Sequence, residues 1–126
     1  SLPLVRFYYS GSSSQQYISG LTVRGIGAPG DSILVDSGNI NEVTLPLMIS
    51  THKTQWEIKG NGFTDTLDVN YDVIPFFESA ECGAMYNFKI TGVSCTSSGI
   101  DSVVIVQKTV NNVSRETLRL YFANRQ

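Results

Sequence analysis

The sequence predicts an all-β protein: a single two-sheet β-sandwich of about nine short, mostly antiparallel strands, with a closed β-barrel as the alternative. Apolar and polar residues alternate along residues 53–59 (KTQWEIK) and 64–73 (TDTLDVNYDV), which is typical of half-buried strands. Between these segments, Asn61 and Gly62 offer the positive φ angles that a tight hairpin needs. Finally, no segment has the apolar periodicity of a helix.

Seven further strands are expected from short apolar or alternating segments bounded by turn residues. In chain order they are Val5–Tyr9, Leu21–Arg24, Ser32–Asp36, Val43–Ile49, Ala84–Cys95, Ser102–Gln107 and Thr117–Phe122. Pro46 cannot donate a ladder hydrogen bond, so its strand is expected at a sheet edge or with a bulge. The apolar run 103–106 (VVIV) predicts a central strand covered on both faces. Gly92 interrupts the alternation around it and predicts a bulge.

Length and charge limit the classes of protein. The 126 residues are expected to form one domain, residues 1–126, with a core that needs neither metal nor disulfide. The net charge is −2 and the nine Lys and Arg residues are scattered, so nucleic acid is not an expected partner. The longest apolar runs are too short to cross a bilayer, so no transmembrane segment is expected.

Gly25, Gly27 and Gly30 have the spacing G-x-G-x-x-G of a dinucleotide-binding loop. Such a loop needs a helix after it, because the helix N-terminus holds the pyrophosphate. Here Pro29 and then a strand-like segment follow. The glycines are therefore interpreted as a bulge at Gly25 and a hairpin turn through residues 28–31, and no cofactor is expected.

Cys82 and Cys95 are separated by 13 residues of one expected strand, a distance of about 40 Å if the chain is extended. We expect two buried thiols; a disulfide would require the chain to reverse at Gly92. The single histidine, His52, lies in a polar loop and is expected to be solvated. One histidine supports neither a typical zinc site nor an argument for a catalytic triad or activated thiol, so no enzymatic activity is expected.

Asp68, Asn70 and Asp72 resemble the start of a calcium loop, but Val73 stands where that loop requires glycine. They are expected to form a solvated outer face of a strand, and no metal site is expected. A hydrolase that uses clustered acids remains an alternative, because carboxylates distant in sequence can meet in a β-protein.

Several aromatic residues could stack on a ligand. Trp56 has the parity of a core residue, whereas Tyr8 and the pair Phe76 and Phe77 are the candidates for exposed, ligand-stacking aromatics. Tyr9 is a weaker candidate. Packing against a neighbouring loop would explain Tyr8, Phe76 and Phe77 equally well.

Five segments together resemble a family of uncharacterised Bacteroidetes lipoproteins of unknown function, over about Leu4 to Phe122. They are LTVRGIGAPGDSILVDSG, TLPL, ECGAMYNFKITGV, IDSVVIV and LRLYF. The resemblance implies export, with lipid attachment through a cysteine upstream of Ser1, and therefore a place in the periplasm or at the outer membrane surface. It implies no activity, and Cys95 is not a position typical of the family.

The same resemblance gives a meaning to three Asp-(Ser/Thr)-apolar triplets, since exported proteins of that phylum can carry O-glycans on such sites. The candidate acceptors are Ser32, Thr66 and Ser102. Alternatively, each triplet is a turn followed by the first residue of a strand.

The sequence as a whole thus predicts an exported, non-catalytic β-sandwich module of the cell envelope that acts in binding or assembly. Its expected partner is an unknown envelope protein or glycan. The alternatives are a carbohydrate-binding module, a hydrolase with clustered acids, and a structural subunit that joins partners by strand addition at a sheet edge.

Overall fold

A computed structural model describes residues 3–27, 33–77, 84–111 and 115–124, and these form ten strands in two sheets with no helix. The four-stranded sheet has the order β4 (Glu42–Thr44), β1 (Leu4–Tyr9), β10 (Glu116–Phe122), β8 (Ile100–Ile105). The six-stranded sheet has the order β3 (Ile33–Ile40), β2 (Ile18–Ile26), β5 (Lys53–Gly60), β6 (Phe63–Phe77), β7 (Ala84–Cys95), β9 (Thr109–Val110). The predicted all-β sandwich is confirmed.

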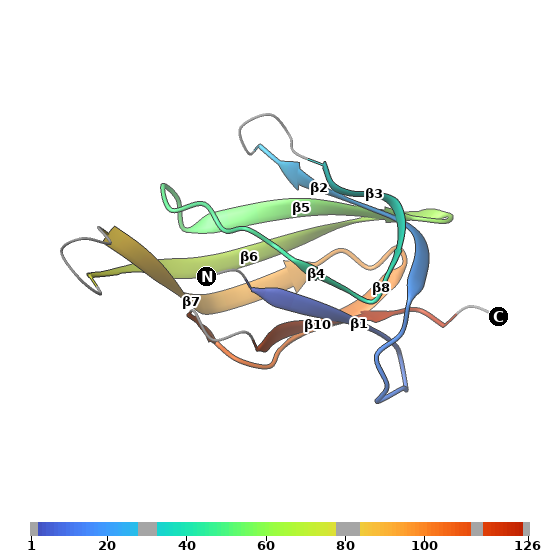
Figure 1. Cartoon of the computed structure of the whole chain (residues 1–126). Helices are drawn as coiled ribbons and strands as arrows, with labels where there is room; N and C mark the ends of the chain where they lie inside the picture. Colours follow the sequence, from blue (N-terminus) through green and yellow to red (C-terminus); the bar gives the residue numbers. More distant parts are fainter. Residues whose placement is uncertain (1–2, 28–32, 78–83, 112–114, 125–126) are drawn as a thin grey trace.

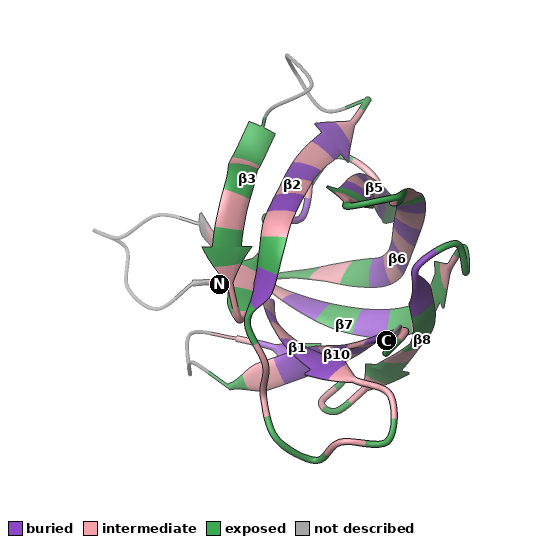
Figure 2. Ribbon diagram, turned by 90° about the vertical axis from the view of Figure 1, so that its right-hand side faces the viewer, coloured by how far each residue is buried: buried purple, intermediate pink, exposed green. Residues whose placement is uncertain are grey.

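The two sheets form layers that face each other across the core (Figure 1). The six-stranded sheet curls, so that β7 comes close to the four-stranded sheet (Figure 2). No ladder joins β7 to β8 in the described chain, so the barrel stays open. All strand pairs are antiparallel except β1 with β10, which run parallel.

The core forms because alternate residues of each strand point between the sheets. Val5 and Phe7 of β1 lie opposite the side chains of the six-stranded sheet, among which Trp56 is 2% exposed. The predicted core position of Trp56 is confirmed. Burying such side chains is the main stabilising term of the fold, at roughly 25 cal/mol per Å² of apolar surface.

The predicted β5–β6 hairpin is confirmed, and its turn begins with Gly60 paired to Phe63. Gly62 has a φ of 79°. Asn61 does not have a positive φ: among the described non-glycine residues, only Ser37 does. The expectation that both Asn61 and Gly62 take positive φ was therefore wrong; one glycine is enough for this turn.

The predicted bulge at Gly92 is also confirmed. Asn70 pairs with Gly92 but the next residue, Tyr71, pairs with Ile90, so Thr91 is the extra residue on β7. The extra residue changes which side chains face inward, as a bulge does.

A bulge was also expected at Gly25, and here the prediction was wrong. Gly25 pairs with Trp56 within an unbroken β2–β5 ladder. The nearby irregularity lies between β2 and β3, where the consecutive residues Val23 and Arg24 pair with Val35 and Ile33. β2 and β3 are antiparallel neighbours, as a hairpin connection requires, although the turn at residues 28–31 lies outside the described residues.

The remaining strand predictions concern β4 and β8, which both lie at an edge of the four-stranded sheet. β4 lies at a sheet edge and ends at Thr44, before Pro46, which confirms the edge position but gives a shorter strand than expected. The central position expected for the VVIV run was wrong. β8 is an edge strand, and Val104 and Val106 are 44% and 47% exposed.

Several strands differ in length from their prediction. β2 and β3 extend beyond the residues expected, and the short β9 is not among the strands expected from the sequence. Pairing with a neighbour extends these strands past the residues whose own pattern is strand-like.

Candidate ligand pocket at one end of the sandwich

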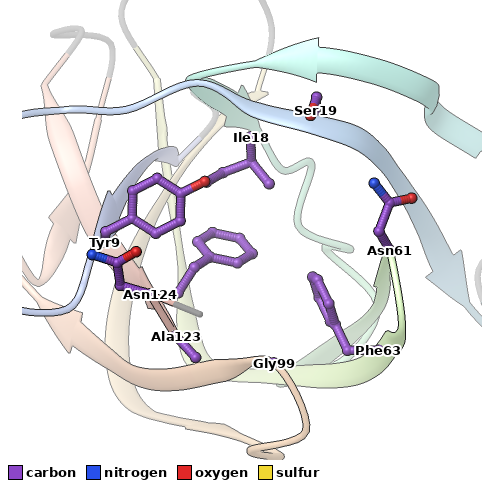
Figure 3. Close-up of a pocket in the computed structure, with 9 residues that line it drawn as sticks. Tyr9, Ile18, Ser19, Asn61, Phe63, Gly99, Ala123 and Asn124 are labelled. Carbon is purple, nitrogen blue, oxygen red and sulfur yellow. The ribbon is translucent and has the colours of Figure 1, made fainter. Parts of the chain in front are cut away.

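A pocket of about 310 Å³ opens at the end of the sandwich where the β5–β6 hairpin turns (Figure 3). The ends of β1 and β10, the start of β2 and the segment before β8 complete its wall. The lining residues are Tyr9, Ile18, Ser19, Asn61, Phe63, Gly99, Phe122, Ala123 and Asn124. The volume lies at the lower end of the range for ligand sites, roughly 300–1,000 Å³.

Aromatic rings form much of the wall. Tyr9 and Phe63 lie on opposite sides of the hollow (Figure 3). Phe122 is 2% exposed and packs edge-on against Phe63, with ring centroids 6.1 Å apart, and against Phe7, at 5.4 Å. Phe122 is thus anchored in the core, whereas Tyr9 and Phe63 are half-buried and reach the pocket.

The ring of Phe63 is fixed by two glycines. A Cβ atom on Gly60, its cross-strand partner, would come within 2.3 Å of the ring, and a Cβ atom on Gly99 within 2.2 Å. No side chain fits at either position without moving the ring. The glycines therefore determine where this wall of the pocket stands.

Gly99 is in turn held by the buried carboxylate of Asp65. This carboxylate accepts hydrogen bonds from the backbone amides of Ser98 (2.7 Å), Gly99 (2.7 Å) and Ile100 (2.9 Å), and from the Thr96 hydroxyl (2.7 Å). Burial alone would raise the pKa of Asp65, but these four hydrogen bonds outweigh it and lower the pKa. Asp65 is therefore an ionised carboxylate that fixes the backbone of residues 98–100 through these hydrogen bonds; we call this arrangement the Asp65 clamp.

The polar groups of the pocket are uncharged. Within the described part of the chain, the side chains of Asn61, Asn124, Ser19 and Tyr9 make no hydrogen bond with another residue. Each amide side chain has donors and an acceptor, and the hydroxyl groups have both functions. A ligand in the pocket would find hydrogen-bonding groups that the protein itself does not use.

Tyr8 is not an exposed aromatic, so this prediction was wrong. Its ring lies on the outer face of the four-stranded sheet but is only 4% exposed, because the guanidinium of Arg119 covers it at 4.8 Å and Tyr121 packs beside it at 5.4 Å. Its hydroxyl donates to the carboxylate of Glu116, 3.2 Å from each oxygen. Burial and the charge of Glu116 raise the pKa of this phenol.

The structure does not bring Phe76 to the pocket. Phe76 is half-buried near the end of the 15-residue strand β6, whereas the pocket residue Phe63 begins that strand. The side chain of Phe77 lies outside the described residues.

The three candidate O-glycan acceptors do not come together either. Ser102 is exposed on the edge strand β8, and Thr66 is half-buried on β6 opposite Glu57. Ser32 lies outside the described residues. Of the two described acceptors, Ser102 is the more accessible.

The other candidate reactive groups lie apart from the pocket lining. Exposed His52 places its Nδ1 atom 3.3 Å from the Tyr71 carbonyl oxygen. Cys95 is a free, half-buried thiol rather than a fully buried one, and burial, with Asp65 and Asp68 nearby, raises its pKa to about 12. Cys82 lies outside the described residues.

The calcium-like residues lie along one side of β6, as expected for a strand. Asp68 is engaged there, since it pairs with Lys53 at 3.5 Å and accepts a hydrogen bond from Gln55 at 2.8 Å. The described residues contain no group of three or more His, Cys, Asp or Glu side chains placed to hold a metal ion.

Sequence reasoning missed most of the pocket. Tyr9 was rated below Tyr8, and Phe63, Asn61, Asn124 and Asp65 were not considered as site residues. Gly60 opposite Phe63 in the hairpin was the one signal in the sequence, because an aromatic residue often covers a cross-strand glycine.

The fold and the pocket define a β-sandwich protein with a small, uncharged pocket at one end. The chain belongs to a family of unknown function (DUF6452), which matches residues 20–122. No curated protein and no solved structure matches it. The described residues include no helix that could span a membrane.

Proposed function

We propose that this protein is an exported, non-catalytic module of the cell envelope that binds a neutral ligand in the end pocket. The observation that carries the proposal is the lining itself. Half-buried Tyr9 and Phe63 lie on opposite sides of the hollow, and the side-chain amides of Asn61 and Asn124, which bond no other described residue, also line it. Ligand sites commonly combine an apolar wall with a few placed polar groups in this way.

The lining favours an uncharged ligand, because the described residues contribute no Lys, Arg, His, Asp or Glu side chain to it. A charged group that entered the pocket would lose water without gaining a counter-ion, which is costly. A wholly apolar ligand would leave the Asn61 and Asn124 amides without partners.

The lining also favours binding over hydrolysis. A glycosidase needs two carboxylates across its substrate. The described residues of the lining supply none, and the neighbouring carboxylate of Asp65 is buried and occupied by four hydrogen bonds. The clustered-acid hydrolase is therefore the weaker alternative.

Export and lipid anchoring rest on the resemblance to Bacteroidetes lipoproteins. We propose that the native protein carries a lipidated cysteine upstream of Ser1 and resides in the periplasm or at the outer membrane surface. Metabolic labelling with palmitate, followed by cell fractionation, tests this independently of the ligand. Unlabelled protein in the cytoplasmic fraction would contradict it.

Thermal unfolding with a ligand panel tests the binding proposal. The panel holds neutral saccharides, charged peptidoglycan fragments, haem, and calcium against chelator. A ligand at 100 times its dissociation constant stabilises by about 2.7 kcal/mol, which raises the melting temperature by several degrees. We expect such a shift with a neutral compound only.

The double variant Asn61→Ala/Asn124→Ala should lose this shift, whereas Asn39→Ala, an exposed asparagine on β3, should keep it. A shift with calcium or a charged fragment, or one that survives in the double variant, would overturn the proposal.

A second candidate function, assembly through strand addition, is favoured by the edge strand β8, which presents exposed Val104 and is followed directly by exposed Val106. Val104→Lys should then lower the sedimentation coefficient of a self-associated form. Unchanged sedimentation of wild type and variant as monomers would remove self-assembly from consideration.

A further inference from the structure

We propose that the ligand is the terminal sugar of a neutral glycan, held between the rings of Tyr9 and Phe63 and bonded by the amides of Asn61 and Asn124. This inference rests on the proposed function and names the chemical class of its ligand. It follows from three properties of the pocket: the chemistry of its walls, its size and its closed inner end.

The chemistry of the walls matches a pyranose ring. Such a ring has two apolar C–H faces and a rim of hydroxyl groups. The rings of Tyr9 and Phe63 lie on opposite sides of the hollow, where a sugar between them could contact either ring through its C–H groups (Figure 3). Each sugar hydroxyl both donates and accepts, as do the amide groups of Asn61 and Asn124.

The size of the pocket favours a single ring or little more. Its volume of about 310 Å³ lies at the bottom of the range for ligand sites. A glycan that runs along the protein would need an extended groove.

The inner end of the pocket is closed. The ring of Phe122 is 2% exposed, Gly99 is buried, and the Ala123 amide donates to the Gly99 carbonyl oxygen at 2.8 Å. These residues leave no exit on the core side. A sugar ring that fills the pocket to this end must therefore be the last ring of its chain, with the rest of the glycan outside.

The wall at Phe63 is fixed before any ligand arrives. Gly60 and Gly99 hold the ring from two sides, and Asp65 holds Gly99. Pre-organised groups bind more tightly because less freedom is lost on binding. This rigidity suits a site that selects one ring shape.

Isothermal titration tests the proposal with four neutral monosaccharides (glucose, galactose, mannose and N-acetylglucosamine) and the linear tetrasaccharides of glucose, mannose and N-acetylglucosamine. We expect at least one sugar to bind, with affinities of the monosaccharide and its tetrasaccharide within about threefold, because only the end ring is held. Asn61→Ala and Asn124→Ala should each weaken binding at least about tenfold, as expected for a lost hydrogen bond of about 1.4 kcal/mol.

Asn39→Ala is the matched control and should bind like the wild type. Since Asn61 and Asn124 are exposed, their alanine variants should fold, which an unchanged melting temperature verifies. Affinity that rises more than tenfold from monosaccharide to tetrasaccharide would overturn the terminal-sugar inference. The titration also includes neutral non-sugar compounds (an aliphatic diol and a blocked neutral dipeptide), and binding of one of these while every saccharide fails would overturn this inference but not the proposed function. Failure of all neutral ligands would overturn both.

Discussion

The ring of Phe63 packs directly against the α-carbon of Gly99, so that a Cβ atom at residue 99 would lie 2.2 Å from ring carbon Cγ. This contact joins the β5–β6 hairpin of one sheet to the segment that enters β8 of the other. The Phe63 ring thus bridges the two sheets at the wall of the pocket, and the missing side chain at Gly99 leaves room for it.

Gly99→Ala should therefore destabilise the protein and deform the pocket. The added methyl group must push the Phe63 ring out of its position, and overpacking of this kind costs about 1–3 kcal/mol. Urea unfolding measures the loss. Gly92→Ala is the control, because a Cβ atom there meets nothing closer than the Asn70 amide nitrogen at 4.0 Å. Equal stability of Gly99→Ala and wild type would show that the ring is not confined.

Asp65→Asn should remove the clamp on the same segment. An amide cannot accept all four hydrogen bonds that the carboxylate accepts, and its NH₂ group would face backbone donors, so we expect a loss of about 3 kcal/mol at pH 7. Asp72→Asn, on an exposed residue of the same strand, should change stability by less than about 0.5 kcal/mol.

The Asp65 clamp also predicts that the stability of the protein depends on pH. The pKa of Asp65 is lower in the folded state than the 3.8 of a free side chain. Its contribution is therefore fully present above about pH 4 and is lost as the pH falls below 3.8 through the folded pKa. Between pH 5 and pH 2, wild type should lose more stability than Asp65→Asn. Parallel curves for the two proteins would show that Asp65 does not titrate in this way.

On the outer face of the four-stranded sheet, Glu116 is the shared acceptor of a second cluster. Its carboxylate accepts from the Tyr8 hydroxyl and from Arg6 at 3.3 Å, and it also bonds Arg119. Glu116→Ala should cost about 1–3 kcal/mol, because the buried Tyr8 hydroxyl loses its partner. Glu42→Ala removes two exposed interactions, the ion pair with Arg6 and a hydrogen bond from the Gln15 side-chain amide, and should cost less than about 1 kcal/mol. Urea unfolding measures both losses. Similar losses of stability in the two variants would contradict the larger contribution that Glu116 is expected to make through the Tyr8 hydroxyl.

The Cys95 thiol should be unreactive in the folded protein. With a pKa of about 12, only about one thiol in 10,000 is ionised at pH 8, and the thiolate is the reacting form. Alkylation by iodoacetamide, followed by peptide mass spectrometry that separates Cys95 from Cys82, should be at least about 100-fold slower for Cys95 than in urea. Rapid labelling of folded Cys95 would contradict the burial of this thiol.

The sequence correctly predicted those strands and bulges that are determined by the residue pattern of the segment itself. Alternation along residues 53–59 and 64–73 located β5 and β6, and Gly92 located the bulge in β7 because a bulge is a property of the chain at that position. The run VVIV was misplaced for the opposite reason. Whether a strand is central or at an edge depends on its neighbours, and among the described strands β8 has a neighbour on one side only.

The pocket could not be predicted because residues distant in sequence build it. Parity assigned Tyr8 to an outer face, and the strand does place it there. What covers Tyr8, however, is Arg119 and Tyr121, more than 100 residues later. Tyr9 has the inward parity of a core residue, and it reaches the pocket because β1 ends with it. Phe63 and Gly99 become neighbours only when the sheets pack.

The most direct test of the central claim, a neutral sugar in the end pocket, is an NMR titration of the ¹⁵N-labelled chain with the tightest-binding neutral saccharide. The account predicts that the side-chain amide signals of Asn61 and Asn124 and the backbone amide of Gly99 shift together, while the signals of Asp72 and Val104 do not. Shifts that gather on the edge of β8 or on the outer face of β6, or no shift at millimolar sugar, would contradict it.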